Sequence, residues 1–213
     1  MAEFARPGAE QWVPDDAGLD GLRAAAPDCR GCELYRDATQ VVFGSGPDRA
    51  RLMLVGEQPG DSEDKAGEPF VGPAGRLLAD ALAAAGVRAE DAYVTNAVKH
   101  FRFEERGKRR LHKSPAVAHI EACHPWLDAE FRTVRPDVVV ALGATAARGV
   151  LGRTVRVLAE RGRVLDERPA VAPEARVVLT VHPSAVLRLR GKPEFDPEFD
   201  GLVADLRTAA DLL

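Results

Sequence analysis

The sequence predicts an α/β protein, a three-layer α/β/α sandwich around a central four-stranded parallel sheet. Four short apolar runs are rich in Val, Leu and Ile and nearly continuous, as is typical of strands covered on both faces. These runs span residues 51–56, 92–98, 137–143 and 176–181. Helical patterns separate them, and strand–helix alternation favours parallel strands joined by right-handed crossovers.

The helices are predicted from their apolar periodicity and end signals. Over residues 73–85 the apolar side chains share one face; Pro73 suits a first helical turn and Gly86 suits the position after the last turn. Further helices are expected over residues 144–151 and 196–213. The polar stretch 1–20 is expected to be a loose tail, and residues 21–213 a single domain.

Composition limits the kinds of partner. No apolar run is long enough to span a membrane, and the N-terminus has no apolar core of a secretory signal, so a cytoplasmic location without a membrane partner is expected. The net charge of −4 argues against a protein that coats nucleic acid with its whole surface. A local basic patch exists, however, because residues 99–113 hold seven Lys or Arg and two Glu. Repeats and coiled-coil patterns are absent, so a monomer without an obligate protein partner is expected.

Polar residues follow three of the predicted strands. Glu57 and Gln58 follow the first strand in the segment GEQPG, Asn96 lies near the end of the second, and His182 follows the last. Ligands of parallel α/β folds bind at the carboxyl ends of strands, so these side chains suit one small planar ligand. The sequence has neither the P-loop nor the dinucleotide-binding glycine pattern.

Each of these residues also has a simpler interpretation. GEQPG could be an ordinary turn, Asn96 and His182 could be satisfied by the backbone, and Phe70 could be a core aromatic rather than a stacking platform. The segment KRRLH, residues 108–112, could be a solvated basic loop or a loop that clamps phosphates beside the site.

Three cysteines are too few for a disulfide framework. Cys29 and Cys32 form a C-x-x-C pair and Cys123 stands far away, which favours a metal site. A fourth ligand would come from His100, His119 or His124. A structural zinc ion and an iron–sulfur cluster both remain open from the residues alone.

Taken in order, these motifs resemble the uracil-DNA glycosylase superfamily, specifically its UdgX branch, a relative of the iron–sulfur family 4 enzymes. The resemblance covers roughly residues 25–210 through the cysteine pair, GEQPG, PFVGPAGRLL, YVTNAVKH, KRRLH, LGATAA and HPSAVLR. It implies a uracil-DNA glycosylase-like fold and a [4Fe–4S] cluster held by Cys29, Cys32, His100 and Cys123. Histidine in place of the fourth family 4 cysteine, Gln58 in place of a small residue, and the inserted basic loop all fit the UdgX branch.

The resemblance also implies the site. Uracil-containing DNA, preferably single-stranded, would be the substrate; Gln58, Phe70, Asn96 and His182 would bind uracil. Lys108, Arg109, Arg110 and Lys113 would contact DNA, with Arg110 supporting the loop. His112 would form a covalent bond with C1′ of the sugar after uracil leaves, assisted by Glu57, and His182 would stabilise the departing base.

These residues fit that chemistry. One amide at Asn96 can pair with O4 and N3–H of uracil, whereas cytosine presents the reverse pattern. A donor at His182 would stabilise charge that develops on uracil O2. The alternatives are a family 4 glycosylase that turns over, a non-catalytic iron–sulfur nucleic-acid binder, and a zinc-clipped binding module.

Overall fold

A mixed five-stranded sheet forms the centre of the protein, whose computed structural model describes residues 6–213. The strand order is β2-β1-β5-β7-β6, and the first four of these are parallel. They span Leu52–Gly56 (β1), Ala92–Asn96 (β2), Val138–Leu142 (β5) and Arg176–Thr180 (β7). The four predicted strands are therefore confirmed, each with slightly shorter bounds.

The prediction of a purely four-stranded parallel sheet was wrong by one strand. Residues Val164–Leu165 form β6, which pairs antiparallel with β7 at the edge of the sheet. Only two residues pair, and they follow a run of alternating arginines, so the sequence carries no strand periodicity there.

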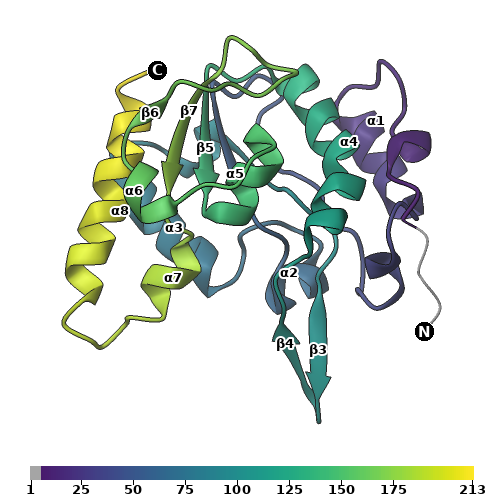
Figure 1. Cartoon of the computed structure of the whole chain (residues 1–213), viewed down its shortest axis with the longest axis horizontal. Helices are drawn as coiled ribbons and strands as arrows, with labels where there is room; N and C mark the ends of the chain where they lie inside the picture. Colours follow the sequence, from purple (N-terminus) through teal and green to yellow (C-terminus); the bar gives the residue numbers. More distant parts are fainter. Residues whose placement is uncertain (1–5) are drawn as a thin grey trace.

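Helices cover both faces of the sheet (Figure 1). On one face lie α1 (Leu19–Ala25), α4 (Val117–Val134) and α5 (Ala144–Leu151). On the other lie α3 (Pro73–Ala84), α7 (Pro183–Leu187) and α8 (Phe195–Ala210). Two short helices, α2 (Asp61–Ala66) and α6 (Val157–Glu160), lie in the connections. None of the helices within residues 6–213 is long and apolar enough to cross a membrane.

The core has two apolar layers because successive strand residues point to opposite faces. In β1, Met53 and Val55 pack with the α4 side of the core, whereas Leu52 and Leu54 pack with α3 and α8. All four are at most 2% exposed. This double burial is the physical reason why the strands read as continuous apolar runs.

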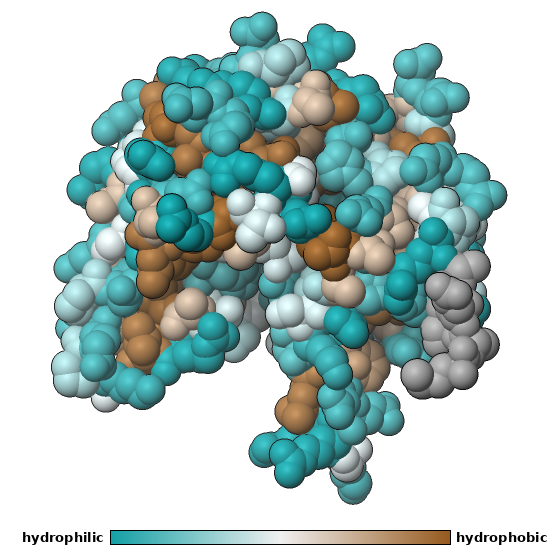
Figure 2. Space-filling view, in the orientation of Figure 1, coloured by the Kyte–Doolittle hydropathy of each residue, from teal (hydrophilic) through white to brown (hydrophobic). Residues whose placement is uncertain are grey.

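The basic segment forms a hairpin rather than a loop. Strands β3 (Phe103–Arg106) and β4 (Arg109–His112) pair antiparallel, with His112 opposite Phe103. The hairpin projects from the body as a largely hydrophilic finger (Figures 1 and 2). Because most residues of the hairpin are charged, the sequence lacks the apolar alternation that predicts strands, and these two strands were not expected.

The N-terminal segment differs from the expected loose tail. Ala9 and Leu19 are each 1% exposed and belong to the core cluster on the α4 side. Gly8 donates a backbone hydrogen bond to Gly31, next to the cysteine pair. Residues 1–5 of the predicted tail lie outside the described residues.

Candidate active site

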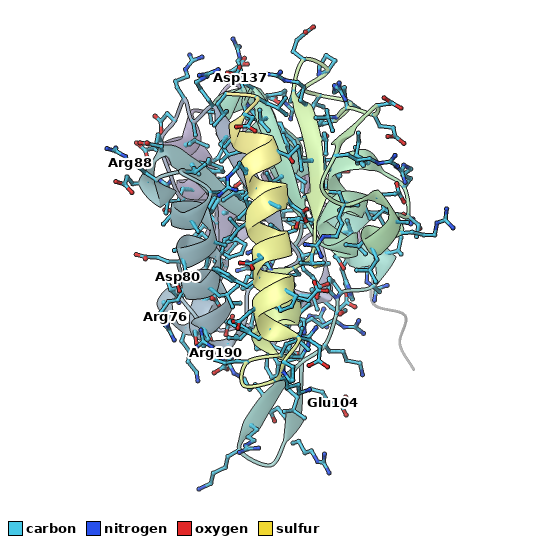
Figure 3. All side chains as sticks on the ribbon, turned by 90° about the vertical axis from the view of Figure 1, so that its left-hand side faces the viewer. Arg76, Asp80, Arg88, Glu104, Asp137 and Arg190 are labelled. Atoms are coloured by element: carbon cyan, nitrogen blue, oxygen red, sulfur yellow. The ribbon has the colours of Figure 1, made fainter. Side chains whose placement is uncertain are left out.

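The carboxyl ends of the parallel strands bring the predicted residues together. Because β1 lies between β2 and β5, and β7 is next, the loops that follow all four strands emerge at one end of the sheet. Figure 3 shows Glu104 of the hairpin at this end and Asp137, which precedes β5, at the opposite end. The prediction that Glu57, Asn96 and His182 share a site is consistent with this topology.

A pocket of about 360 Å³ opens at this end of the sheet. Its lining includes Gln58, Phe70, Asn96, His112 and His182. A larger groove of about 820 Å³ lies at the opposite end, where Asp137 and Ala175 precede β5 and β7. The smaller pocket is the candidate site because the titratable and amide groups converge there.

Asn96 and Phe70 form the floor of the pocket, beside Gly56 at the end of β1. A Cβ atom at Gly56 would lie 2.4 Å from Asn96 Oδ1 and 2.7 Å from Phe70 Cζ, so only glycine leaves room for both side chains. Asn96 is 3% exposed, and within residues 6–213 its side-chain amide has no hydrogen-bond partner. Phe70 has a φ of 59°, a strained backbone conformation for a bulky residue and a feature typical of functional sites. The pocket therefore combines an unpaired amide with an aromatic ring.

His182 is neutral at ordinary pH, and its tautomer follows from its contacts. Burial lowers the pKa of its imidazole to about 4. Its Nδ1 accepts a hydrogen bond from the backbone N–H of Ser184 at 3.2 Å and lies 2.8 Å from the Ser184 hydroxyl. The proton of the neutral ring is thus on Nε2, which makes that nitrogen a donor.

Glu57 and His112 meet at the pocket although 55 residues separate them along the chain. The Glu57 Oε1 atom lies 3.5 Å from His112 Nε2, and the Glu57 side chain is 20% exposed. The His112 side chain is 48% exposed at the end of β4. A carboxylate beside an accessible imidazole can orient the ring and accept its proton.

Gln58 lines the pocket, and its side chain also contacts the base of the hairpin. Its Oε1 accepts the Arg102 backbone N–H, and its Nε2 donates to the carbonyls of Arg102 and Lys113 at 3.1 and 3.2 Å. The same Nε2 atom lies 3.1 Å from His112 Nε2. Gln58 thus fastens the hairpin beside His112, and its predicted contact with the base stays a prediction.

Arg110 also holds the hairpin, in line with the supporting role expected for it. Its guanidinium lies 2.6 Å from Asp61 and 2.6 Å from Asp64, both of which lie on α2. It also stacks over the ring of Phe103, with 5.0 Å to the centroid. In the free protein its guanidinium is engaged in these internal ion pairs, and its contact with DNA stays a prediction.

The other predicted DNA-contacting residues are exposed. Lys108 and Arg109 lie at the turn and start of β4, and Lys113 follows the hairpin, 3.2 Å from Glu104. Near the pocket, Arg188 lies 3.5 Å from the Ser184 hydroxyl through Nη1. The sequence analysis did not identify Asp61, Asp64 and Arg188 as parts of the site. For the two aspartates a signal was available, because they form an acidic pair three residues apart directly after GEQPG.

Comparisons with known proteins agree with this geometry. The sequence profile of the Uracil DNA glycosylase superfamily matches residues 43–207. The chain belongs to the uracil DNA glycosylase superfamily. It is 34% identical to the type-4 uracil-DNA glycosylase of Archaeoglobus fulgidus over 187 residues, which cover 85% of this chain and 89% of the relative.

Two further members of the superfamily are similarly close. The type-4 uracil-DNA glycosylase of Thermotoga maritima is 39% identical over 163 residues, 76% of this chain and 79% of the relative. That of Pyrobaculum aerophilum is 35% identical over 185 residues, 85% of this chain and 89% of the relative. The predicted superfamily is therefore confirmed, and the fold class with it.

The three cysteines of this superfamily member gather on the α4 side of the sheet. All three are buried and unpaired by disulfides. Burial raises the pKa of Cys123 to about 12, and the charges of Cys32 and Cys29 interact with its thiol. N–H groups point at the sulfurs: Trp126 Nε1 lies 3.2 Å from Cys29 Sγ, the Lys99 backbone nitrogen lies 3.3 Å from Cys123 Sγ, and the Leu34 backbone N–H bonds the Cys32 thiol. Such donors are typical of thiolates that ligate iron–sulfur clusters.

The candidate histidine ligands differ in what their rings contact. His119 uses both ring nitrogens, toward Ala116 and Glu33, and His124 uses both, toward Asp128 and Gly149. His100 is 6% exposed, and its ring has no hydrogen bond or ion pair within residues 6–213. Burial lowers the pKa of His100 to about 4, so its ring is neutral, the form that binds metal.

Within residues 6–213, no three or more His, Cys, Asp or Glu side chains converge so that they could hold a single metal ion. The ligands of a four-iron cluster surround it, each bound to a different iron, and need not converge on one point. The donor set of three thiols and one free imidazole fits such a cluster in kind and number.

Proposed function

We propose that this protein excises uracil from DNA, preferably single-stranded, and that His112 then bonds covalently to C1′ of the abasic sugar, as in the UdgX branch. The observation that carries the proposal is the Glu57–His112 pair, whose Oε1 and Nε2 atoms lie 3.5 Å apart at the rim of the pocket. A glycosylase that only delivers water to the sugar needs no imidazole beside this carboxylate.

Uracil is read by Asn96 and stacked on Phe70. The buried Asn96 amide offers one donor and one acceptor, so a base with the wrong pattern would leave polar groups unpaired. A single strand reaches the pocket without the cost of a few kcal/mol for flipping a paired base. The exposed Lys108, Arg109 and Lys113 contact phosphates along the hairpin.

His182 stabilises the departing base. When the C1′–N1 bond breaks, its electron pair stays with uracil, and negative charge grows on O2. The Nε2–H of the neutral His182 ring donates to that oxygen. Because the ring is neutral in the resting protein, it acts as a hydrogen-bond donor without transferring its proton.

His112 captures the sugar cation that remains. A lone pair of the neutral imidazole attacks C1′ and forms an N–C1′ bond. The ring becomes positively charged and its remaining N–H proton passes to Glu57 or to solvent. The N-alkylated imidazole is a poor leaving group, so the protein stays on its abasic product and turnover stops.

Cys29, Cys32, His100 and Cys123 would hold a [4Fe–4S] cluster. In this position the cluster fastens the N-terminal segment and α4 to the loop that follows β2. It has no part in the steps derived above.

A family 4 glycosylase that turns over is the second candidate. The relatives reported above carry that name, and the side chain of His112 is half-exposed, so water could reach the sugar as well. A non-catalytic iron–sulfur nucleic-acid binder would have the same basic hairpin but would release no uracil.

A denaturing gel separates these candidates. The protein is mixed with an end-labelled single-stranded oligonucleotide that contains one uracil, then boiled in SDS. We expect a heat-stable band at the summed mass of protein and DNA. His112→Ala should lack this band and, because water then reaches the sugar, should release uracil with turnover.

The control is an oligonucleotide with cytosine in place of uracil, which should give no band. Abasic sites in excess of wild-type protein, without a band, would contradict the covalent step and support the second candidate. DNA binding without free uracil would contradict both.

A further inference from the structure

We infer that Thr145 is a positioning residue that holds Glu57 toward His112. The Thr145 hydroxyl fixes the Glu57 carboxylate, and the carboxylate in turn orients the His112 imidazole. The Thr145 hydroxyl donates to Glu57 Oε2 at 2.6 Å, and the other oxygen, Oε1, is the one that lies 3.5 Å from His112 Nε2. The consequence for catalysis rests on the proposed function, but the contact itself concerns the free protein.

The length of the hydrogen bond indicates that it is strong. An O–H···O⁻ distance of 2.5–2.7 Å is typical of a charge-assisted bond, roughly twice as strong as a neutral one. A helical threonine commonly returns its hydroxyl to a carbonyl of its own helix, as Thr133 does to Ala129 at 2.8 Å. Thr145 lies in the first turn of α5, where the carbonyls three and four residues back belong to β5, and its hydroxyl donates to a residue 88 positions away. Its hydroxyl is therefore committed to the site rather than to its helix.

The fold delivers Thr145 to this position. It is the second residue of α5, which begins directly after β5, and β5 lies beside β1, whose end leads into Glu57. Gly143, between β5 and α5, has a φ of 89°, and a Cβ there would lie 3.2 Å from His182 Cβ. Glycine thus permits the sharp entry that brings the first turn of α5 against both strand ends.

Glu57 needs such a restraint because a second imidazole, that of His182, is near enough to feel its charge. The Glu57 charge also acts on His182, whose pKa it tends to raise. A carboxylate free to rotate could turn to either imidazole. Fixing Oε2 on Thr145 leaves Oε1 for His112, which selects the imidazole that becomes the nucleophile and leaves His182 as the neutral donor.

The test measures the nucleophilicity of His112 directly, in the free protein, with diethyl pyrocarbonate as the electrophile. The chain has five histidines, so mass spectrometry can follow each one. We compare Thr145→Val, which keeps the shape and loses the donor, with Thr145→Ser, which keeps the donor. Thr133→Val is the matched control, and Glu57→Gln gives the rate without a carboxylate.

We expect Thr145→Val to slow modification of His112 by roughly tenfold, toward the rate of Glu57→Gln, since small displacements of a catalytic group have effects of this size or larger. In Thr145→Ser and in Thr133→Val, diethyl pyrocarbonate should modify His112 at the wild-type rate. Modification of His124, whose side chain is 37% exposed, should be equal in all variants and reports on folding. A wild-type rate for His112 in Thr145→Val would overturn the inference.

The same variants are then mixed with the uracil-containing oligonucleotide. In one outcome, His112 is modified more slowly in Thr145→Val, but the wild type forms no adduct with DNA. This result supports the Thr145 contact and contradicts the covalent step. An adduct formed equally fast by Thr145→Val and the wild type supports the covalent step and contradicts the role of Thr145. A slower adduct, rescued by Thr145→Ser, supports both.

Discussion

Two side chains that line the pocket acquire their roles from their surroundings. Asn96 and His182 are ordinary residue types, and either could be satisfied by neighbouring backbone. Among the residues that the structure describes, the Asn96 amide has no hydrogen-bond partner. Within the same residues His182 is bound through Nδ1 alone, which leaves Nε2 to donate. An amide and a neutral donor that face one cavity form a site for a polar heterocycle.

The burial of His182 predicts a pH dependence of stability. Its pKa is about 4 in the folded protein, against 6.5 for an unperturbed histidine. The unfolded chain therefore takes up a proton near pH 6.5, before the folded protein does. Stability should fall as pH decreases from about 6.5 to about 4, with a slope of up to about 1.4 kcal/mol per pH unit from this residue. Above pH 6.5 this contribution is constant.

Urea unfolding of the wild type and of His182→Asn between pH 4 and 8 measures this slope. The difference in unfolding free energy between the two proteins should change with pH only inside the stated window. A difference that is the same at pH 7 and pH 4.5 would show that His182 is not buried in the neutral form.

The β3–β4 hairpin is the element that carries the nucleophile. Two attachments hold it to the body: Gln58 at its base and the ion pairs of Arg110 with Asp61 and Asp64 on α2. Asp64 is fully buried, so its pairing with Arg110 matters more than a surface ion pair would. A two-stranded ribbon alone is at best marginally stable in water, so these attachments determine where His112 lies.

Removing the Gln58 attachment should loosen the hairpin without unfolding the domain. Gln58→Leu loses three hydrogen bonds to backbone groups of Arg102 and Lys113. We expect amide hydrogen exchange to accelerate within residues 103–112, and adduct formation to slow about tenfold, while uracil release changes less.

Gln11→Leu, at an exposed position, is the control for the replacement of a glutamine amide by an apolar side chain. Equal exchange rates in Gln58→Leu and the wild type would mean that the α2 ion pairs alone hold the hairpin. Uracil release that slows as much as adduct formation would instead assign Gln58 to the base.

Across the molecule, the proposed cluster ligands come from segments that are far apart along the chain. Cys29 and Cys32 belong to the N-terminal segment, Cys123 to α4, and His100 to the loop after β2. A buried ion pair reinforces the same region: Lys99 Nζ donates to Glu130 Oε2 at 2.5 Å and to the carbonyl of Asn96 at 2.7 Å. The proposed cluster and the pocket floor are thus connected through residues 96–100.

The cluster proposal predicts that His100 is required for iron. The purified protein should be brown and hold about four irons per chain. His100→Ala should hold less iron and melt at a lower temperature, whereas His100→Cys should keep the cluster. His124→Ala should match the wild type, because the ring of His124 already bonds Asp128 and Gly149. Full iron content in His100→Ala would contradict the assignment.

The sequence alone determined the features that depend on local pattern. Continuous apolar runs predicted the four parallel strands, and the order of polar residues at their ends predicted a shared site for Glu57, Asn96 and His182. The cysteine spacing predicted a metal-binding group. The prediction of the strands succeeds because burial on two faces follows directly from residue type and position, and the shared direction of parallel strands makes a shared site at their ends the natural expectation.

Only the tertiary structure decided how side chains are partnered. The two-residue strand β6 forms because the edge of β7 offers backbone groups for pairing. Ala9 is buried because it packs into the core cluster on the α4 side of the sheet. Gln58 holds a hairpin whose ends lie 44 and 55 residues away, and Thr145 reaches Glu57 across 88 residues. A polar side chain is satisfied by whichever group the fold brings near it, and periodicity carries no information about that partner.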